Sequence, residues 1–491
     1  MNRLHLVRTQ KPPVTTHYTS RTLDSTQPAA SRRRACVKQL ELGPSKTMAY
    51  RSVCKTLVNL HGGATFVQMR HLSTSNKLNN SYRAVVVGGG AGGLAMASML
   101  GSKFGKSQVA VVEPSDNHYY QPMWTMVGGG LKTFDQSARM TKDIFPSNAT
   151  WIQDAAVKFD PDNNTVYTKD GKELKYDLLI VAMGLQLRFE QVKGLQEAIA
   201  NDPMVCSNYS AETVMKTFPA LQKLESGNAI FTFPNTPIKC AGAPQKIMYL
   251  AEHYFSKHGK RDKINIIYNS SLPVIFGVKK YANELLKIIE ERNITVNFRH
   301  SLSEVNHEKK EAVFVKLDSE NQETVNFNYD FLHVSPPMGS PDVLKNSPIA
   351  AENGFLAVHK ETGQHTKYPN IFGIGDCTDI PTAKTAAAVA AQSGVLNRTI
   401  EAVLAGREPQ KLYDGYTSCP LVVGYDKCIL AEFDFNAQPL ETFPFDQGKK
   451  RTSMYYLKKD MMPEFYWKGL IKGKWEGPGV FRKILHLGMG K

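Results

Sequence analysis

Two of the seven cysteines stand in settings that suit redox chemistry. Cys240 precedes a predicted helix, with Pro244 suited to the first helical turn, and Lys239 and Lys246 lie on either side of it. A helix N-terminus and nearby cations lower the pKa of a thiol, and the thiolate is the nucleophilic form. The local sequence alone fits a reactive thiolate and a buried, inert cysteine equally well.

Cys419 is the second candidate, because Pro420 follows it and favours an extended backbone there. The cysteines have an odd count, wide spacing and no Cys-x-x-Cys pair, which argues against a disulfide framework, a zinc cluster and a haem attachment. The thirteen histidines show no metal-ligand spacing, so no metal site is predicted. We interpret Cys206, Cys377 and Cys428 as small packing residues.

Residues 88–93, Gly-Gly-Gly-Ala-Gly-Gly, contain the spacing G-x-G-x-x-G. They follow a predicted strand and open a predicted helix, and Glu113 ends the next strand, which is the context of a dinucleotide site. Gly88 permits the tight turn, Gly90 lets the backbone approach a pyrophosphate, and Gly93 allows helix and strand to pack closely. The helix N-terminus offers N–H donors to phosphates, and Glu113 can accept hydrogen bonds from a ribose.

Two later segments favour FAD over NAD. Residues 373–376, Gly-Ile-Gly-Asp, resemble the second flavin-binding signature of two-dinucleotide-domain flavoproteins, where this aspartate, Asp376, meets the ribityl chain. Residues 182–184, Ala-Met-Gly, stand where that superfamily usually has Ala-Thr-Gly, and the Met departs from the pattern. A pyridine nucleotide would need a second glycine-rich loop, but the strand predicted over 264–268 runs into Asn-Ser-Ser-Leu-Pro. The electron donor is therefore predicted to be something other than NAD(P)H.

The alternation of strands and helices that positions these residues predicts an α/β fold with two nested Rossmann-like domains. The predicted strands span residues 83–87, 108–113, 178–182, 228–233, 263–268 and 371–376, with a β-meander over 151–184. The predicted helices span residues 94–104, 245–255, 281–292 and 383–400.

The predicted domain boundaries follow from this alternation. The FAD-binding domain is discontinuous and takes residues 80–197 and 343–410. The second Rossmann-like domain takes residues 198–342 and carries Cys240, and an aromatic-rich C-terminal region at 411–491 carries Cys419.

The N-terminal segment accounts for most of the positive charge. Residues 1–72 hold twelve Lys or Arg and two acids, so they carry +10 of the formal +15. The segment is rich in Arg, Ser and Thr and ends in Arg70-His71-Leu72, which resembles a matrix-protease site, so we predict a mitochondrial transit peptide. A basic tail without a targeting role is the alternative. The remaining +5 is spread without a dense basic run, which argues against a nucleic-acid partner.

The C-terminal segment suggests contact with a membrane. No stretch of 18 consecutive apolar residues occurs, so no spanning helix is predicted. Residues 461–487 mix aromatic, aliphatic and cationic side chains, which suits helices lying in a membrane interface. A packed C-terminal arm or a dimer contact is the alternative.

From about residue 83 onward the chain resembles the animal mitochondrial sulfide:quinone oxidoreductases. The strings that carry the resemblance are EPS and YYQP at 113–122, FPNTP and CAGAPQK at 233–246, KTAAAVAAQ at 384–392 and GYTSCP at 415–420. The resemblance implies FAD as cofactor and a peripheral, monotopic position on the mitochondrial inner membrane. It also implies FAD contacts from Ala91, Gly92, Glu113, Gln121, Ala156, Asp376 and Lys384.

By the same resemblance, Cys240 and Cys419 form a redox pair on one face of the flavin and are bridged through a sulfur atom at rest. Hydrogen sulfide, as hydrosulfide, would attack the bridge, leaving a persulfide on Cys419 and a thiolate on Cys240 that donates to the flavin. Lys384 would stabilise negative charge on reduced flavin. Glutathione, sulfite or cyanide would accept the outer sulfur, and ubiquinone would take the electrons.

Three alternatives remain at this point. A type II NADH:quinone dehydrogenase would need a second glycine-rich loop and would not need either cysteine. A flavocytochrome-type sulfide dehydrogenase would need a haem subunit. A non-enzymatic, flavin-bearing regulator would present a basic surface after removal of the transit peptide.

Overall fold

The structure is a computed structural model that describes residues 80–488. The predicted transit peptide, residues 1–72, lies outside the described residues. The described residues belong to one unit, Ser75–Lys491.

The first sheet begins with the strand that leads into the glycine-rich loop. β1 (Ser81–Val87) lies parallel between β2 (Val109–Val112) and β8 (Glu173–Val181), and α1 (Ala91–Phe104) connects β1 to β2. The second half of β1 and all of β2 are buried Ala and Val residues, as a parallel sheet covered on both faces requires. These elements form the βαβ unit that the sequence predicts.

The strand order of this sheet is β5-β2-β1-β8-β7-β6, with β19 (Ile371–Gly373) paired in parallel to β8. β6 (Ala156–Asp160) and β7 (Thr165–Thr168) form an antiparallel meander with β8. β5 (Thr150–Ile152) instead pairs in parallel with β2. The predicted meander over 151–184 was therefore wrong for its first strand, since β5 extends the parallel edge of the sheet.

The second sheet is parallel throughout, in the order β10-β17-β11-β12-β13. Its strands are β10 (Val205–Cys206), β11 (Gly227–Phe233), β12 (Ile264–Ser270), β13 (Thr295–Phe298) and β17 (Phe331–His333). The helices of this region are α6 (Ala211–Lys223), α7 (Ala243–Lys257) and α8 (Lys279–Glu291). A separate antiparallel sheet holds β14 (His300–Asn306), β15 (Glu311–Lys316) and β16 (Thr324–Asn328). Two nested Rossmann-like units are thus present, and the fold class is confirmed.

Several short elements lie outside the three larger sheets. They are β3 (Asn117–Tyr119), α2 (Trp124–Gly128), α3 (Phe134–Ser137), β4 (Ala138–Met140), α4 (Thr141–Ile144), β9 (Gln186–Leu187), α5 (Leu195–Asn201), β18 (Met338–Gly339) and α9 (Asp342–Lys345).

The chain after residue 385 crosses both regions. α10 (Ala386–Leu404) packs on α1, and the Thr385 side chain caps its N-terminus by accepting from the Ala388 N–H. The hairpin β20 (Thr417–Val422) and β21 (Cys428–Phe433) follows and is buried almost throughout. It shares one hydrophobic core with α7 of the second region. The boundaries of the three domains stay a prediction.

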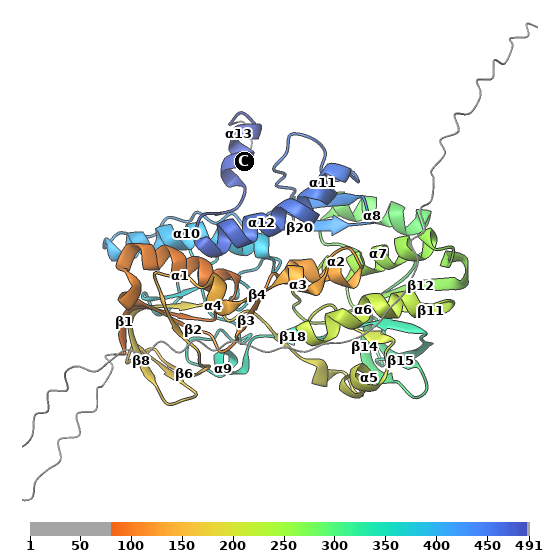
Figure 1. Cartoon of the computed structure of the whole chain (residues 1–491), viewed down its shortest axis with the longest axis horizontal. Helices are drawn as coiled ribbons and strands as arrows, with labels where there is room; N and C mark the ends of the chain where they lie inside the picture. The colour runs from red at the N-terminus through yellow and green to blue at the C-terminus, as the bar shows by residue number, and fades with distance from the viewer. Residues whose placement is uncertain (1–79, 489–491) are drawn as a thin grey trace, which may run out of the picture. The chain divides into compact units, whose positions relative to one another are not determined.

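The last residues divide into a packed part and an exposed part. α11 (Thr452–Tyr456), α12 (Met462–Glu464) and the turns after them run back over the first region, where the Ser98 hydroxyl donates to the Ile471 carbonyl over 2.8 Å. α13 (Gly479–Leu485) stands away from the sheets in Figure 1. Part of this arm packs inward as far as Ile471, while Met461 and Phe465 stay exposed, so its contact with a membrane interface stays a prediction. Within residues 80–488 no helix is long and apolar enough to cross a membrane.

Candidate active site and cofactor cavity

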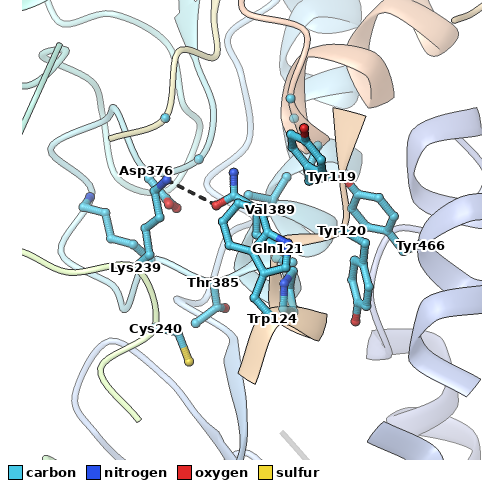
Figure 2. Close-up of a pocket in the computed structure, with 18 of the residues that line it drawn as sticks. Tyr119, Tyr120, Gln121, Trp124, Lys239, Cys240, Asp376, Thr385, Val389 and Tyr466 are labelled. Carbon is cyan, nitrogen blue, oxygen red and sulfur yellow. Dashed lines mark hydrogen bonds between the residues drawn. The ribbon is translucent and has the colours of Figure 1, made fainter. Parts of the chain in front are cut away.

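One cavity of about 470 Å³ is lined both by the glycine-rich loop and by Cys240. Figure 2 shows Asp376, Lys239 and Cys240 at one side of this cavity and Tyr119, Tyr120 and Tyr466 at the other. The predicted site residues that line it are Gly88, Gly90, Ala91, Gly92, Glu113, Gln121, Cys240, Asp376 and Lys384.

The glycine loop is built for close approach of backbone. Gly88 has φ +102°, and a Cβ there would lie 2.5 Å from the Ala182 carbonyl oxygen. Gly93 does not line the cavity, and a Cβ there would meet the Gly88 carbonyl, which fits its predicted packing role. Gly90 caps the N-terminus of α1, and a Cβ there would meet nothing within 4 Å. The open space at Gly90 faces the cavity, where a pyrophosphate can approach N–H donors.

Glu113 holds the loop from the next strand. One carboxylate oxygen accepts from the Gly89 N–H over 2.7 Å, and the other accepts from the Ser115 N–H over 2.8 Å. Each carboxylate oxygen keeps acceptor capacity beyond one bond, so Glu113 can also accept from a ribose hydroxyl.

The far end of the cavity is charged. Burial raises the pKa of Asp376, while Lys384 and Lys239 oppose that shift. The Lys239 ammonium donates to the Gln121 side chain over 3.2 Å, drawn as a dashed line in Figure 2. The Lys384 ammonium donates to the Thr378 carbonyl over 2.8 Å and lies 5.0 Å from the Phe355 ring centroid.

These features fit FAD. One end offers a glycine cradle with a helix N-terminus, and Thr385 and Ala386 bring the N-terminus of α10 to the same cavity. Ala156 is the exception among the predicted contacts, because it begins β6 and is not a lining residue of the cavity. Its contact with FAD stays a prediction without support from the cavity lining.

The two redox candidates meet at the other wall of the cavity, where Cys240 is a lining residue and the buried Cys419 is not. The Sγ atoms of Cys240 and Cys419 lie 3.2 Å apart, although the residues come from the turn before α7 and from β20. Cys240 has φ +55°, a left-handed conformation that costs on the order of 1 kcal/mol for a non-glycine residue. Gly242 leaves room for the pair, since a Cβ there would lie 2.4 Å from the Cys419 Sγ.

The surroundings of the pair give the two thiols different pKa values. The hydrogen bond with Cys419 holds the pKa of Cys240 well below its usual range; burial opposes this, and Lys246 and Lys458 add to it. The same hydrogen bond and burial raise the pKa of Cys419 well above its usual range. The Lys246 ammonium donates to the Cys240 Sγ over 3.3 Å. Cys240 is thus the thiolate of the pair and Cys419 the thiol.

Lys239 does not act on Cys240 as the sequence suggested. Its ammonium is bonded to Gln121, and it is not among the groups that shift the pKa of Cys240. Lys458 lowers the pKa of Cys240 instead, and the sequence did not predict this role. No local pattern could have found Lys458, because non-local packing of the C-terminal arm brings it to the cysteines.

The remaining described cysteines are inert by their surroundings. Burial raises the pKa of Cys206 to about 12, of Cys377 to about 11 and of Cys428 to about 12. This agrees with their interpretation as packing residues. Across residues 80–488, no group of three or more His, Cys, Asp or Glu side chains could hold a metal ion.

The usual dinucleotide place of the second Rossmann-like unit lies against the C-terminal hairpin. Its first helix, α7, would present its N-terminus to the pyrophosphate. Here β20 packs against α7, and Cys419 and Leu421 lie within 2.6 Å of where a Cβ of Gly242 would stand. The C-terminal hairpin therefore covers the end of α7 that a pyridine nucleotide would need.

Comparison with known proteins agrees with this geometry. Residues 82–218 and 248–394 match the family model of pyridine nucleotide-disulphide oxidoreductases, a class of two-dinucleotide-domain enzymes. Over 419 residues the chain is 56% identical to the mitochondrial sulfide:quinone oxidoreductase of Mus musculus, covering 85% of this chain and 93% of the relative. It is 45% identical to that of Dictyostelium discoideum over 420 residues, covering 85% and 92%. The chain belongs to the mitochondrial sulfide:quinone oxidoreductase family, and its cofactor is FAD.

Solved structures support the fold. The sulfide:quinone oxidoreductase of Aquifex aeolicus has a TM-score of 0.69 and 22% identity, covering 83% of this chain and 95% of that one. NDH2 of Plasmodium falciparum, solved with NADH, has a TM-score of 0.58 and 11% identity, covering 81% and 99%. This fold is thus shared by a sulfide:quinone oxidoreductase and by a protein solved with NADH, so the site residues must decide the electron donor.

Proposed function

We propose that this chain oxidises hydrogen sulfide through Cys240 and Cys419 and passes two electrons to ubiquinone. The observation that carries the proposal is the pairing of these two sulfurs at 3.2 Å, with Cys240 in the lining of the FAD cavity. When bound, FAD accepts two electrons from the sulfur chemistry and delivers them to the quinone.

The separation of the sulfur atoms supports a bridge through one further sulfur. A disulfide bond is ~2.05 Å long, and two such bonds meeting at one sulfur atom span roughly 3.3 Å. The 3.2 Å between the Sγ atoms is close to that span. We infer that the oxidised resting form holds one sulfur atom between Cys240 and Cys419.

The first step divides this bridge unequally. Hydrosulfide attacks the Cys419 sulfur and forms a new S–S bond there, and the bond from Cys419 to the bridge breaks. The electron pair leaves on the Cys240 side, where the Lys246 ammonium stands 3.3 Å from the Sγ and stabilises the negative charge. Cys419, whose pKa is raised, is the poorer thiolate and keeps the persulfide.

The second step returns the site to its resting form. A nucleophilic acceptor, which we propose to be glutathione, sulfite or cyanide, attacks the outer sulfur of the Cys419 persulfide and carries it away. Cys419 is left as a thiolate, and it forms an S–S bond with the sulfur on the Cys240 side, which releases two electrons that FAD would accept when bound. The nearby Lys246 and Lys458 charges favour both anions.

We propose a peripheral position on the mitochondrial inner membrane. Outward side chains of α13 are apolar and exposed, with Val480 at 68%, Phe481 at 53% and Ile484 at 65%. Lys483 adds a cation on the same helix. A short amphipathic helix of this kind suits burial at a lipid headgroup boundary. The quinone is soluble in lipid, so this position brings enzyme and acceptor together.

Anaerobic titration followed through the flavin absorbance tests the function. Sulfide should bleach the flavin within the mixing time, and ubiquinone should restore the absorbance. NADH at the same concentration should leave the flavin oxidised, since the hairpin covers the N-terminus of α7. Rapid bleaching by NADH, with no response to sulfide, would favour the dehydrogenase alternative.

A further inference from the structure

Two lysine ammonium groups stand beside the cysteine pair in the protein interior. Lys246 on α7 is 4% exposed, and Lys458 in the helical stretch Leu457–Met461 is 5% exposed. Both line the cavity. Among the described residues, neither forms an ion pair with an Asp or Glu.

The two lysines differ in what they bind. Lys246 donates to the Cys240 Sγ, so its charge is compensated by that thiolate. Lys458 donates to the Pro122 carbonyl over 3.0 Å and lies 5.7 Å from the Tyr120 ring centroid. A carbonyl and an aromatic ring stabilise a cation, but they do not neutralise it.

This arrangement leaves one positive charge in excess. A buried charge is unfavourable unless an opposite charge compensates it. Burial and then the Lys246 charge lower the pKa of Lys458 to about 8, while the thiols of Cys240, Cys428 and Cys419 oppose the shift. No carboxylate is among the groups that act on it most strongly. The unbridged pair supplies one thiolate for two ammonium groups, and the bridged pair that hydrosulfide attacks supplies none, so the site can take at least one further negative charge.

A neutral donor lies beside the same pair. Tyr209 is 6% exposed and lines the cavity, and its hydroxyl makes no hydrogen bond of good geometry among the described residues, although the Ser335 hydroxyl stands close enough to lower its pKa. Burial, and then the Cys240 charge, raise the pKa of Tyr209, so the hydroxyl keeps its proton. A buried hydroxyl without a partner loses the free energy of a hydrogen bond until a ligand accepts from it.

We propose that Lys458 and Tyr209 form an anion subsite beside Cys240 and Cys419, which holds a small sulfur-bearing monoanion before it attacks. The proposal rests on the function proposed above and adds the group that receives the attacking anion. Hydrosulfide and a deprotonated sulfur acceptor share this chemistry, and both must reach Cys419 or its persulfide. Lys246 cannot serve both the leaving thiolate and the entering anion, so the second charge falls to Lys458.

The test compares four variants with the unaltered enzyme by anaerobic stopped flow, with sulfide as the only substrate. Lys458→Met removes the charge at nearly equal volume, and Lys458→Arg keeps it. Tyr209→Phe removes only the hydroxyl. Lys468→Met is the control, because Lys468 lies on the same C-terminal arm but its side chain is 80% exposed. Flavin content and melting temperature are measured for each protein.

The sulfide concentration for half-maximal flavin reduction should rise about tenfold in Lys458→Met and a few fold in Tyr209→Phe. Lys458→Arg should retain most of the affinity, and Lys468→Met should match the unaltered enzyme. The same variants are compared in steady-state assays with sulfite as the sulfur acceptor, which shows whether the second anion also uses the subsite. A rise in the half-saturating concentration of either anion supports the subsite.

Unchanged half-saturation for both anions in Lys458→Met would overturn the subsite, and so would equal impairment of Lys458→Arg and Lys458→Met. If Lys458→Met does not retain flavin, the other two variants decide. The subsite is then overturned if Tyr209→Phe keeps its sulfide affinity and the affinity of Lys458→Arg falls more than tenfold. If sulfide does not bleach the flavin of the unaltered enzyme, the proposed function is overturned as well. The failure of the subsite and the failure of the proposed function are therefore distinguishable.

Discussion

The backbone N–H of Cys240 donates a hydrogen bond to the carbonyl oxygen of Lys384 over 2.8 Å. Lys239 and Lys384 form an isolated parallel bridge at the same place. This contact fastens the turn of the redox cysteine to the segment that opens α10. The thiolate and the cofactor cavity are therefore held by one backbone bond rather than by side chains alone, and the left-handed φ of Cys240 is fixed by it.

The two cysteines should behave as one unit. Cys240→Ser and Cys419→Ser should each lower sulfide oxidation by about 10³-fold or more with FAD retained, and the double variant should be little worse than either one. Stopped-flow flavin reduction measures the loss. A Cys419→Ser enzyme of full activity would refute the mechanism.

The matched controls are the buried cysteines outside the pair. Cys377→Ser, Cys206→Ser and Cys428→Ser should keep most activity, with stability losses of about 1 kcal/mol from burying a hydroxyl. Mass spectrometry of the resting enzyme should find Cys240 and Cys419 joined, with one additional sulfur atom in the linked peptide.

Gly242→Ala should impair the redox pair without altering either cysteine. The new Cβ would lie 2.4 Å from the Cys419 Sγ and 2.6 Å from Leu421, so the hairpin must move away from α7. Overpacking of this kind costs about 1–3 kcal/mol, and flavin reduction by sulfide should fall by on the order of 10–100-fold. Gly277→Ala is the control, since a Cβ there meets nothing within 4 Å. Equal rates in both variants would contradict the close contact.

Alkylation of the reduced enzyme should show which thiol is ionised. The Cys240 pKa lies well below its usual range, so its thiolate persists above that lowered pKa and its reaction with iodoacetamide should stay constant from pH 9 to pH 7. Lys246→Met removes a stabilising cation and raises this pKa. The rate should then fall about tenfold per pH unit below the new pKa.

Peptide mass spectrometry over the pH series gives these rates. Lys257→Met, at the exposed end of the same helix, should keep the flat profile. A profile for Lys246→Met that remains flat would show that Lys246 does not support the thiolate.

Replacing Val480, Phe481 and Ile484 by Ser should release the protein from liposomes. Each exposed apolar side chain contributes about 1–2 kcal/mol to burial in lipid, so the partition coefficient should fall by on the order of 10²-fold or more. Arg482 is left in place because it is buried and stands over the Tyr416 ring at 4.8 Å. Flotation assays measure binding, with Met215→Ser on α6 as the control for an exposed apolar residue elsewhere. Undiminished flotation would exclude α13 as the anchor.

The parts of the site that local sequence determines were predicted from it. The glycine loop, β1 and α1 are adjacent in the chain, and their spacing is enough to predict a phosphate-binding loop. Pro244 does stand in the first turn of α7, and Cys419 does lie in an extended strand before Pro420. The family strings indicated the pairing of Cys240 with Cys419, which neither local pattern could supply.

The parts that depend on packing between distant segments were not predicted. Lys458 and Tyr209 are ordinary residues in their own surroundings, and only the folded C-terminal arm and the turn before α6 place them in the cavity. The stretch up to Ile471 has the composition of an interface helix, yet Tyr466 donates to the buried, neutral His118 over 2.6 Å and packs inward. Composition predicts that the segment is amphipathic, but it does not predict which surface its apolar face packs against.

The hairpin that carries Cys419 has a consequence for how the protein is made. A ribosome releases the cofactor-binding strands and Cys240 long before β20 and the arm with Lys458 emerge. Until then the Cys240 thiol lacks its partner Cys419, so an unfinished chain lacks the pair that forms the persulfide. The reactive sulfur chemistry switches on only when the last part of the polypeptide has folded onto the first.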